Sequence, residues 1–198
     1  MASPACRDPA LTAQLENLIA QRTAERFESL QAQITALADR RPVPRGLTLI
    51  VFSGDLDKLL AAFMLATGGA AMGLQVSMFF TFWGLTVLKR RRVCKGKGLL
   101  ARLMTALLPC GPGQLRLSRL NLGGLGRRFF TLAMRRHGLE RLPGLIALAR
   151  ESGVRMVVCQ TSMTVMGITK DELIQGVEYG GVAACLDAAL DAGLVMFI

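Results

Sequence analysis

The sequence predicts an α/β fold, a three-layer sandwich around a mostly parallel sheet, with a separate amphipathic helix before it. Short apolar runs that suit buried strands alternate with segments of helical spacing, as in parallel α/β domains. Of the 198 residues, 52% are hydrophobic and 19% are charged, so a substantial core can form. Because the spacing changes after the first helix, we divide the chain into a helical extension with its linker, residues 1–45, and an α/β domain, residues 46–198.

The N-terminal extension is predicted to be one amphipathic helix. Asp8-Pro9 is a typical helix start, with Asp as N-cap and Pro at the first helical position. The apolar stripe then recurs in steps of three and four, at Leu11, Leu15, Leu18, Phe27, Leu30, Ile34 and Leu37. Its phase slips after Leu18, so a long regular zipper is not predicted. We expect another subunit to cover this stripe, and we expect residues 40–44, which contain two prolines, to form a linker.

The α/β domain is predicted to open with a β-α-β unit. Residues 47–52 form a short apolar run that suits a buried strand, and Ser53-Gly54-Asp55 is a turn with Asp55 as the cap of the next helix. That helix is expected to end near Met72, and residues 74–82 are expected to form the second strand. Such a unit implies a right-handed parallel crossover.

A membrane span is an alternative interpretation of part of this unit. Residues 59–88 contain no charged residue, and Lys89-Arg90-Arg91-Arg92 follows at once, as at the inside end of a spanning helix. However, Gly68, Gly69 and Gly73 divide the run. Its second half is β-branched and aromatic, which favours a strand. We therefore favour a soluble helix followed by a buried strand.

The remaining elements follow in the same alternation. Thr169-Lys170-Asp171-Glu172 is a capping box at the start of a short helix. We expect a last helix up to about Ala192 and a terminal strand over residues 194–198. Between the first two strands and the third we expect helices over 96–109, 127–137 and 143–152 and a long glycine-containing loop over 111–126. Loops of that length are usually functional.

Charge and cysteine content limit the possible functions. The formal net charge of +10 suits an anionic partner, but aromatics do not interleave with the basic clusters and no RNA-binding or zinc-finger signature is present, so nucleic-acid binding is not predicted. The chain has a single histidine, His137, and no closely spaced cysteines, so neither a metal site nor a cofactor is expected. Because no signal peptide is visible, we expect a cytoplasmic protein with reduced thiols.

Cys159 is the strongest candidate for chemistry. An apolar run over residues 154–158 ends at this cysteine, and the small polar residues Thr161 and Ser162 follow. In parallel sheets ligands bind at the carboxyl ends of the strands, and a thiol there can be held as thiolate by backbone N–H groups and hydroxyls. The alternative is a small buried cysteine that caps a core strand, because free cysteines are often buried.

Other motifs are weaker candidates. Cys110, next to Gly111-Pro112-Gly113, would be a second, resolving thiol or an incidental exposed cysteine. Gly123-Gly124-Leu125-Gly126 follows no strand, so a mobile lid is a better interpretation than a phosphate cradle. The aromatic run 79–83 would wall an apolar pocket or simply pack in the core. No Ser-His-Asp set can be assembled, which disfavours ordinary hydrolysis.

Four blocks of the sequence resemble a known family. In order they are Phe79-Phe80-Thr81-Phe82-Trp83-Gly84-Leu85, Leu117-Ser118-Arg119-Leu120-Asn121-Leu122-Gly123-Gly124-Leu125-Gly126, Cys159-Gln160-Thr161-Ser162-Met163-Thr164-Val165-Met166-Gly167-Ile168, and Gly176-Val177-Glu178-Tyr179-Gly180-Gly181-Val182-Ala183. They look like the DsrE/DsrF-like sulfur-relay family, in its peroxiredoxin-like branch, over roughly residues 46–198. Peroxiredoxin activity itself is not implied, because the Pro-x-x-x-Thr-x-x-Cys motif is absent.

The resemblance implies a flavodoxin-like fold, homo-oligomers and a cysteine that carries sulfane sulfur as persulfide or thiosulfonate, here Cys159. It also implies a rhodanese-type sulfur donor and a TusA-like carrier protein as acceptor, and some relatives have been regarded as membrane-associated. We expect Ser53, Phe82 and Trp83 to line the pocket mouth and the loop 111–126 to cover it, with Asn121, Gly123 and Gly124 in that loop. Two alternatives stay open: a non-catalytic oligomeric binding or scaffold protein, and a membrane-anchored relay component.

Overall fold

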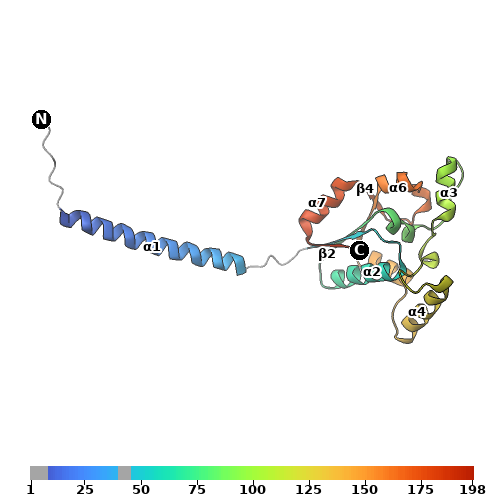
Figure 1. Cartoon of the computed structure of the whole chain (residues 1–198), viewed down its shortest axis with the longest axis horizontal. Coiled ribbons are helices and arrows are strands. Elements are labelled where there is room, and N and C mark those ends of the chain that lie inside the picture. Colours follow the sequence, from blue (N-terminus) through green and yellow to red (C-terminus); the bar gives the residue numbers. More distant parts are fainter. Residues whose placement is uncertain (1–8, 40–45) are drawn as a thin grey trace. The chain divides into compact units, whose positions relative to one another are not determined.

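The computed structural model describes the backbone of residues 9–39 and 46–198, and side chains over residues 13–36 and 46–198. Internal contacts divide the chain into two units, Met1–Val43 and Pro44–Ile198. The described residues of the first unit form the helix α1 (Pro9–Asp39), where the extension was predicted to be helical (Figure 1). The predicted cap at Asp8, the predicted linker 40–44 and Cys6 lie outside the described residues.

The second unit is built on a five-stranded sheet. Its strands are β1 (Gly46–Val51), β2 (Gln75–Phe80), β3 (Arg155–Cys159), β4 (Glu178–Gly180) and β5 (Gly193–Phe197). They are ordered β4-β3-β2-β1-β5, and every neighbouring pair is parallel. The α-helices are α2 (Leu56–Ala71), α3 (Leu99–Leu107), α4 (Leu125–Arg136), α5 (Leu142–Glu151), α6 (Gln160–Met166) and α7 (Val182–Ala192). Short 3₁₀ turns are η1 (Phe82–Leu88), η2 (Pro112–Gln114), η3 (Leu122–Gly124) and η4 (Lys170–Glu172).

Helices cover both faces of the sheet, which confirms the predicted three-layer α/β class (Figure 1). Side chains alternate along each strand, so Leu47, Leu49 and Val51 of β1 point to one face, into the large core beneath α2 and α5. Ile50 points to the opposite face and packs against a smaller buried cluster. On that face α7 lies over the sheet, and the Thr48 hydroxyl donates a 2.9 Å hydrogen bond to the Ala188 carbonyl.

The uncharged run over residues 59–88 folds as most of α2, all of β2 and η1. Gly73, with a φ of +81°, stops α2 in the left-handed conformation that glycine adopts most easily, and β2 begins two residues later. Within residues 9–39 and 46–198, no helix has the length and apolar character needed to cross a membrane.

The segment between η1 and α5 departs most from the predicted boundaries. The expected helix over 96–109 is shorter, as α3, and α4 begins at Leu125 rather than at residue 127. Gly123 and Gly124 both have positive φ, a conformation that glycine adopts easily. The turn that they form leads the chain directly into α4. The predicted loop 111–126 therefore contains two 3₁₀ turns and the first residues of a helix.

A buried ion network ties this segment to η4. The Glu172 side chain is fully buried and forms the predicted capping box with Thr169. Its carboxylate also accepts a 2.6 Å hydrogen bond from Lys97 and a 3.0 Å bond from the amide of Val93, and it lies 3.6 Å from the buried Lys89 ammonium. Lys97 donates in turn to Thr105, the one buried residue of α3. One carboxylate thus holds α3 and the basic segment before it.

Candidate functional site

Cys159 is the last residue of β3 and the N-cap of α6. Its side chain is only 4% exposed and belongs to a small buried cluster with Phe79, Val157 and Cys185, on the sheet face that α7 covers. The thiol therefore lies at the carboxyl edge of the parallel sheet, where the end of the apolar run predicted it. In parallel α/β domains this edge is where ligands bind.

Four hydrogen-bonding groups determine the acidity of the Cys159 thiol. Burial alone would raise its pKa, but hydrogen bonds from the Ser162 hydroxyl and amide, the Thr81 hydroxyl and the Thr161 amide outweigh burial, and the pKa is lowered. The Thr81 and Ser162 hydroxyls also lie 2.8 Å apart. Each hydroxyl carries one proton. Both hydroxyls can therefore donate to the thiolate, or one can donate to the thiolate while the other donates to its neighbouring hydroxyl. The arrangement stabilises the nucleophilic form of the sulfur.

Thr81 donates a hydrogen bond to the Cys159 thiol, a role that the sequence did not predict. In the parallel register Phe80 lies beside Val158, so the next residue of each strand, Thr81 and Cys159, emerges at the same edge. The amide of Thr81 donates a 3.0 Å bond to the Val51 carbonyl, which holds it at the end of β1. The position of Thr81 directly after an apolar strand could have marked it as a residue of the carboxyl edge. Only the strand order and register show that this edge position lies beside Cys159.

The segment after Thr81 is held tightly against the end of β1. Gly84 donates its amide to the Phe52 carbonyl at 2.8 Å, and a Cβ at Gly84 would lie 2.2 Å from the Val51 carbonyl oxygen, so only glycine fits. The Phe82 ring lies 5.6 Å from the Phe52 ring, and Phe82 has a φ of +43°, which is strained for an aromatic residue. Such strain is typical of functional sites, and both rings remain partly exposed.

Two of the predicted pocket residues share a cavity. Ser53 and Trp83 line a space of about 360 Å³ at the carboxyl edge of the sheet, together with Phe52, Lys58 and Arg116. Phe82 directly precedes the lining residue Trp83 in the sequence, and its ring packs on the ring of Phe52. Asp55 also lines this cavity and pairs with Lys58 at 2.9 Å, so Arg116 supplies the net positive charge of the lining.

The glycine-rich residues lie elsewhere. Gly123 and Gly124 line a different cavity, with Arg127, Arg128 and Arg135 of α4, rather than standing among the groups that hydrogen-bond Cys159. Asn121 precedes them, and its buried Oδ1 has no hydrogen-bond partner among the residues that the structure describes. That the 111–126 segment covers Cys159 stays a prediction.

Cys110 and Cys185 have contrasting positions. Cys110 is half-buried beside Pro109, a residue that lines the 360 Å³ cavity, and its amide donates to the Gln114 side chain. Its role as a second thiol stays a prediction. Cys185 of α7 is buried in the same cluster as Cys159. Burial and then the negative charge of a Cys159 thiolate raise the pKa of Cys185, so it remains a thiol where Cys159 ionises.

Over the described part of the chain, no three or more His, Cys, Asp or Glu side chains gather where they could hold an ion.

We expect Ser162→Ala to raise the pKa of Cys159, because the variant removes the hydroxyl that acts most strongly against burial. Alkylation of Cys159 by iodoacetamide, followed by peptide mass mapping, should slow by roughly fivefold near neutral pH, the equivalent of one lost hydrogen bond. Its pH–rate profile should move to higher pH. The control is Thr161→Val, which keeps the Thr161 amide donor; its profile should match the wild type. An unchanged profile for Ser162→Ala would contradict the assignment.

One known family matches most of this chain. The family described as DsrE/DsrF/DrsH-like matches residues 45–197. The chain is similar to the uncharacterized protein YrkE of Bacillus subtilis (strain 168), with 36% identity over 76% of this chain and 95% of that protein. It is also similar to the sulfur carrier protein DsrE2 of Allochromatium vinosum, with 31% identity over 77% of this chain and 97% of that protein.

Solved structures are more distant. The E. coli ychN protein matches with a TM-score of 0.46 and 14% identity, over 78% of this chain and 99% of that one. A protein of unknown function, MTH1491 from Methanobacterium thermoautotrophicum, matches with a TM-score of 0.46 and 12% identity, over 77% of this chain and 97% of that one.

Proposed function

Because this chain belongs to the DsrE/DsrF/DrsH-like family, we propose that it is a sulfur-relay protein that carries sulfane sulfur on Cys159. A relative at 31% identity is named a sulfur carrier protein, which supports the proposal. The observation that carries it is the environment of the thiol: a cysteine at the carboxyl edge of the sheet whose pKa is lowered by donors from two neighbouring strand ends.

The proposed transfer is thiol–persulfide exchange. The Cys159 thiolate attacks the outer sulfur of a donor persulfide, a new S–S bond forms at Cys159, and the donor leaves as its thiolate. An acceptor thiolate then attacks the same outer sulfur and releases the Cys159 thiolate. No external oxidant is needed, because the sulfane sulfur keeps its oxidation state. The Ser162, Thr81 and Thr161 donors stabilise the Cys159 thiolate before the first step and after the second.

The test is sulfur loading followed by mapping. The protein is incubated with polysulfide, with tetrathionate, or with thiosulfate and a rhodanese, and its intact mass is measured. We expect a mass gain of sulfur or thiosulfonate that a reductant reverses, and peptide mapping should place it on Cys159. No adduct, or an adduct on another cysteine alone, would refute the assignment.

Partners follow from the chemistry. A rhodanese-type enzyme is the proposed donor and a TusA-like protein the proposed acceptor, both of which present the persulfide or thiol that the exchange needs. We further propose a homo-oligomer, because α1 leaves apolar side chains such as Leu18, Phe27 and Ile34 exposed in the single chain. The cytoplasm is the proposed location, because cysteine thiols stay reduced in that compartment.

A non-catalytic oligomeric binding or scaffold protein is the second candidate. The low exposure of Cys159 and its contact with an apolar cluster favour this alternative. It predicts that Cys159 resists both alkylation and sulfur loading in the folded protein, so the loading experiment distinguishes the two functions. A membrane-anchored relay component is less well supported, because residues 59–88 fold into separate elements.

A further inference from the structure

Two buried cysteines lie on the sheet face that α7 covers. Cys159 is 4% exposed and Cys185 is 7% exposed, and the two belong to one cluster with Phe79 and Val157. The proposed sulfur transfer uses Cys159 alone and gives Cys185 no part. A thiol in the same cluster as a sulfur-carrying cysteine can react with the sulfur which that cysteine carries.

The beginning of α7 lies close to the end of β3. In the parallel register Cys159 lies beside Gly180 of β4, and α7 starts two residues after Gly180, with Cys185 as its fourth residue. A Cβ on Gly180 would lie 3.0 Å from the Cβ of Ala184 and 3.0 Å from Cγ1 of Val157. Both distances are shorter than an ordinary van der Waals contact, so the missing side chain lets α7 approach β3 closely.

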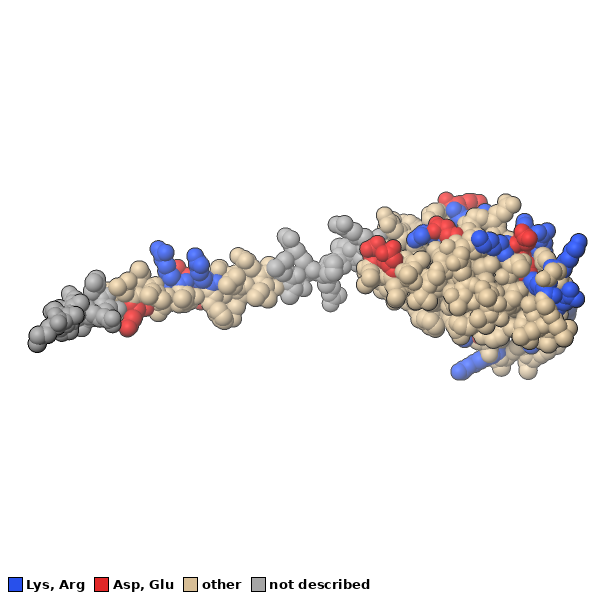
Figure 2. All heavy atoms as spheres, turned by 90° about the horizontal axis from the view of Figure 1, so that it is seen from above, with Lys and Arg blue, Asp and Glu red and all other residues tan. Residues whose placement is uncertain are grey.

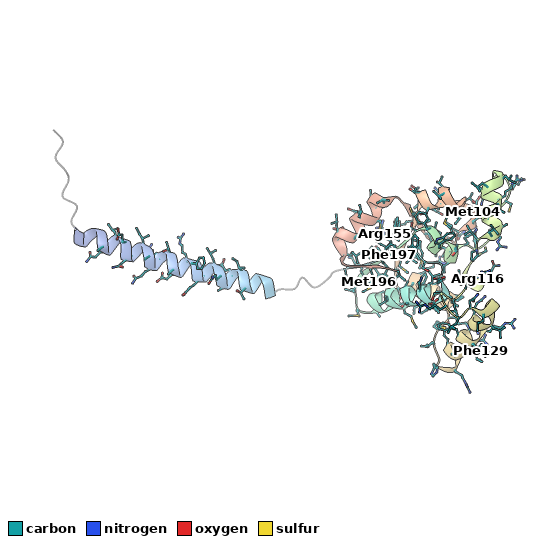
Figure 3. All side chains as sticks on the ribbon, viewed as in Figure 1. Met104, Arg116, Phe129, Arg155, Met196 and Phe197 are labelled. Carbon is teal, nitrogen blue, oxygen red and sulfur yellow. The ribbon has the colours of Figure 1, made fainter. Side chains whose placement is uncertain are left out.

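The direction of α7 places Cys185 at the Cys159 end of β3. Arg155, four residues before Cys159, lies on the same face of the sheet, because side chains alternate along a strand. The pKa of Arg155 is raised mainly by its hydrogen bond to Glu178, and the charge of Asp187 in α7 adds to the effect. Arg155 and Asp187 also line one cavity, and Figure 3 shows Arg155 next to the α7 ribbon. The helix therefore runs along β3 from its carboxyl end toward its amino end.

The two thiols also act on each other electrostatically. Burial raises the pKa of Cys185, and the negative charge of the Cys159 thiolate raises it further. A charge has this effect on a neighbouring thiol only over a short distance. When Cys159 binds sulfur, its Sγ atom loses the charge, which moves outward to the bound sulfur. Cys185 is then easier to ionise than it is beside the free thiolate.

We propose that Cys185 is the resolving thiol of the loaded protein and closes a disulfide with Cys159 when no acceptor collects the sulfur. The proposal rests on the sulfur-carrier function and adds a second fate for the sulfur bound at Cys159. The geometry that supports it is the shared cluster and the close approach of α7 to β3 at Gly180.

The closing step is a thiol–disulfide exchange within the chain. Cys185 attacks the Sγ atom of the Cys159 persulfide, a disulfide forms between the two cysteines, and the bond from Sγ to the outer sulfur breaks. The outer sulfur takes the electron pair of the broken bond and the proton of Cys185, and it leaves as hydrosulfide. The bound sulfane sulfur is reduced to sulfide while the two thiols are oxidised, so no other oxidant is required. From a thiosulfonate, thiosulfate leaves in the same way and the proton passes to water.

The apolar cluster favours the closed product. An ionised persulfide places a negative charge beside Phe79 and Val157, and a charge in apolar surroundings costs free energy. The disulfide is uncharged, and the released hydrosulfide or thiosulfate enters water. Because Cys185 keeps its proton near neutral pH, we expect closure to be slower than collection of the sulfur by an acceptor thiolate. Cys185 therefore ends the loaded state when an acceptor is absent.

Oxygen-free loading without an acceptor tests closure in the full chain. Reduced wild-type protein is treated briefly with tetrathionate, and the excess is removed. This reagent is a dianion, which suits a domain whose surface carries grouped Lys and Arg side chains (Figure 2). Intact masses and non-reducing peptide maps are then followed with time. We expect the Cys159 adduct to decay to a protein lighter than the reduced chain by the two thiol hydrogens, with the Cys159 and Cys185 peptides linked and thiosulfate released in equal amount.

Three variants identify the resolving thiol. Cys185→Ser should load at Cys159 and keep the adduct roughly tenfold longer than the wild type or more, because the attacking sulfur is absent. Cys185→Ala should behave in the same way without placing a hydroxyl in the apolar cluster. Cys94→Ser is the matched control, since Cys94 is exposed and lies outside the cluster, and its adduct should decay as in the wild type.

The outcomes separate this proposal from the sulfur-carrier function. An adduct on Cys159 that decays equally fast in the wild type and in both Cys185 variants would overturn the resolving role and leave the carrier function standing. A disulfide between Cys159 and Cys110 would overturn it too, because Cys110 would then be the resolving thiol. Neither an adduct nor a disulfide at Cys159 would refute the carrier function itself, and this proposal with it.

Discussion

Replacing Cys159 by serine is expected to abolish sulfur loading at this site. Serine has nearly the same size and can keep the hydrogen bonds to Thr81 and Ser162, so the fold around the site should persist. Its hydroxyl does not ionise near neutral pH and does not accept sulfane sulfur. After incubation with polysulfide, intact-mass measurement should show complete loss of the adduct that wild type carries on the Cys159 peptide.

The other cysteines supply the controls for this variant. Cys94→Ser removes an exposed thiol and should load like the wild type. Cys185→Ser should also load, because burial keeps Cys185 protonated. Cys110→Ser distinguishes two roles for that residue: a second thiol predicts normal loading but slower release to an acceptor thiol, and an incidental cysteine predicts no change in either. Loading of Cys159→Ser at the wild-type level would move the carrier to another cysteine.

Glu172→Gln is expected to cause the largest loss of stability. The nearly isosteric amide removes the one negative charge between Lys89 and Lys97, and those side chains are 0% and 6% exposed. A buried cation that loses its partner costs about 3–5 kcal/mol of unfolding free energy. Because Lys97 also holds Thr105, we expect α3 to loosen first. Urea unfolding followed by circular dichroism measures the loss.

The Arg155–Glu178 pair is the matched control for this prediction. Its side chains are 47% and 54% exposed, and their 2.7 Å contact is screened by water, so Glu178→Gln should cost less than about 1 kcal/mol. Equal losses of unfolding free energy in Glu172→Gln and Glu178→Gln would contradict the claim that burial makes the Glu172 network the more stabilising one.

The acid sensitivity of the protein gives a second readout for Glu172. Burial would raise the Glu172 pKa, but hydrogen bonds from Lys97, Val93 and Thr169 and the charge of Lys89 lower it below the ordinary 4.5. A lowered folded-state pKa stabilises the protein above the ordinary value, and this contribution is lost as the pH falls through the folded-state pKa. The difference in stability between wild type and Glu172→Gln should therefore shrink over that acidic range.

Local pattern was enough for most of the fold. The apolar run before Cys159 predicted a buried strand with a thiol at its carboxyl end, and β3 ends at that residue. The capping box at Thr169 and Glu172 is also present as predicted. These features succeed because hydrogen bonding within a helix or turn and the two-residue period of a strand depend on neighbouring residues. Boundaries around α3 and α4 were less accurate, since positive φ at Gly123 and Gly124 decides where α4 begins.

The sequence by itself determined most of the helices and strands, where the charge lies and which thiol stands at a strand end, but it did not predict the short strand β4 or the 3₁₀ segment η1. Only the tertiary structure decided what surrounds that thiol. Thr81 contacts Ser162, which lies eighty-one residues later in the sequence, and Cys185 joins the Cys159 cluster from α7. The tertiary structure likewise decided that Glu172 lies between Lys89 and Lys97. The physical reason is that these contacts depend on strand order and register, which the chain acquires only when distant apolar faces pack together.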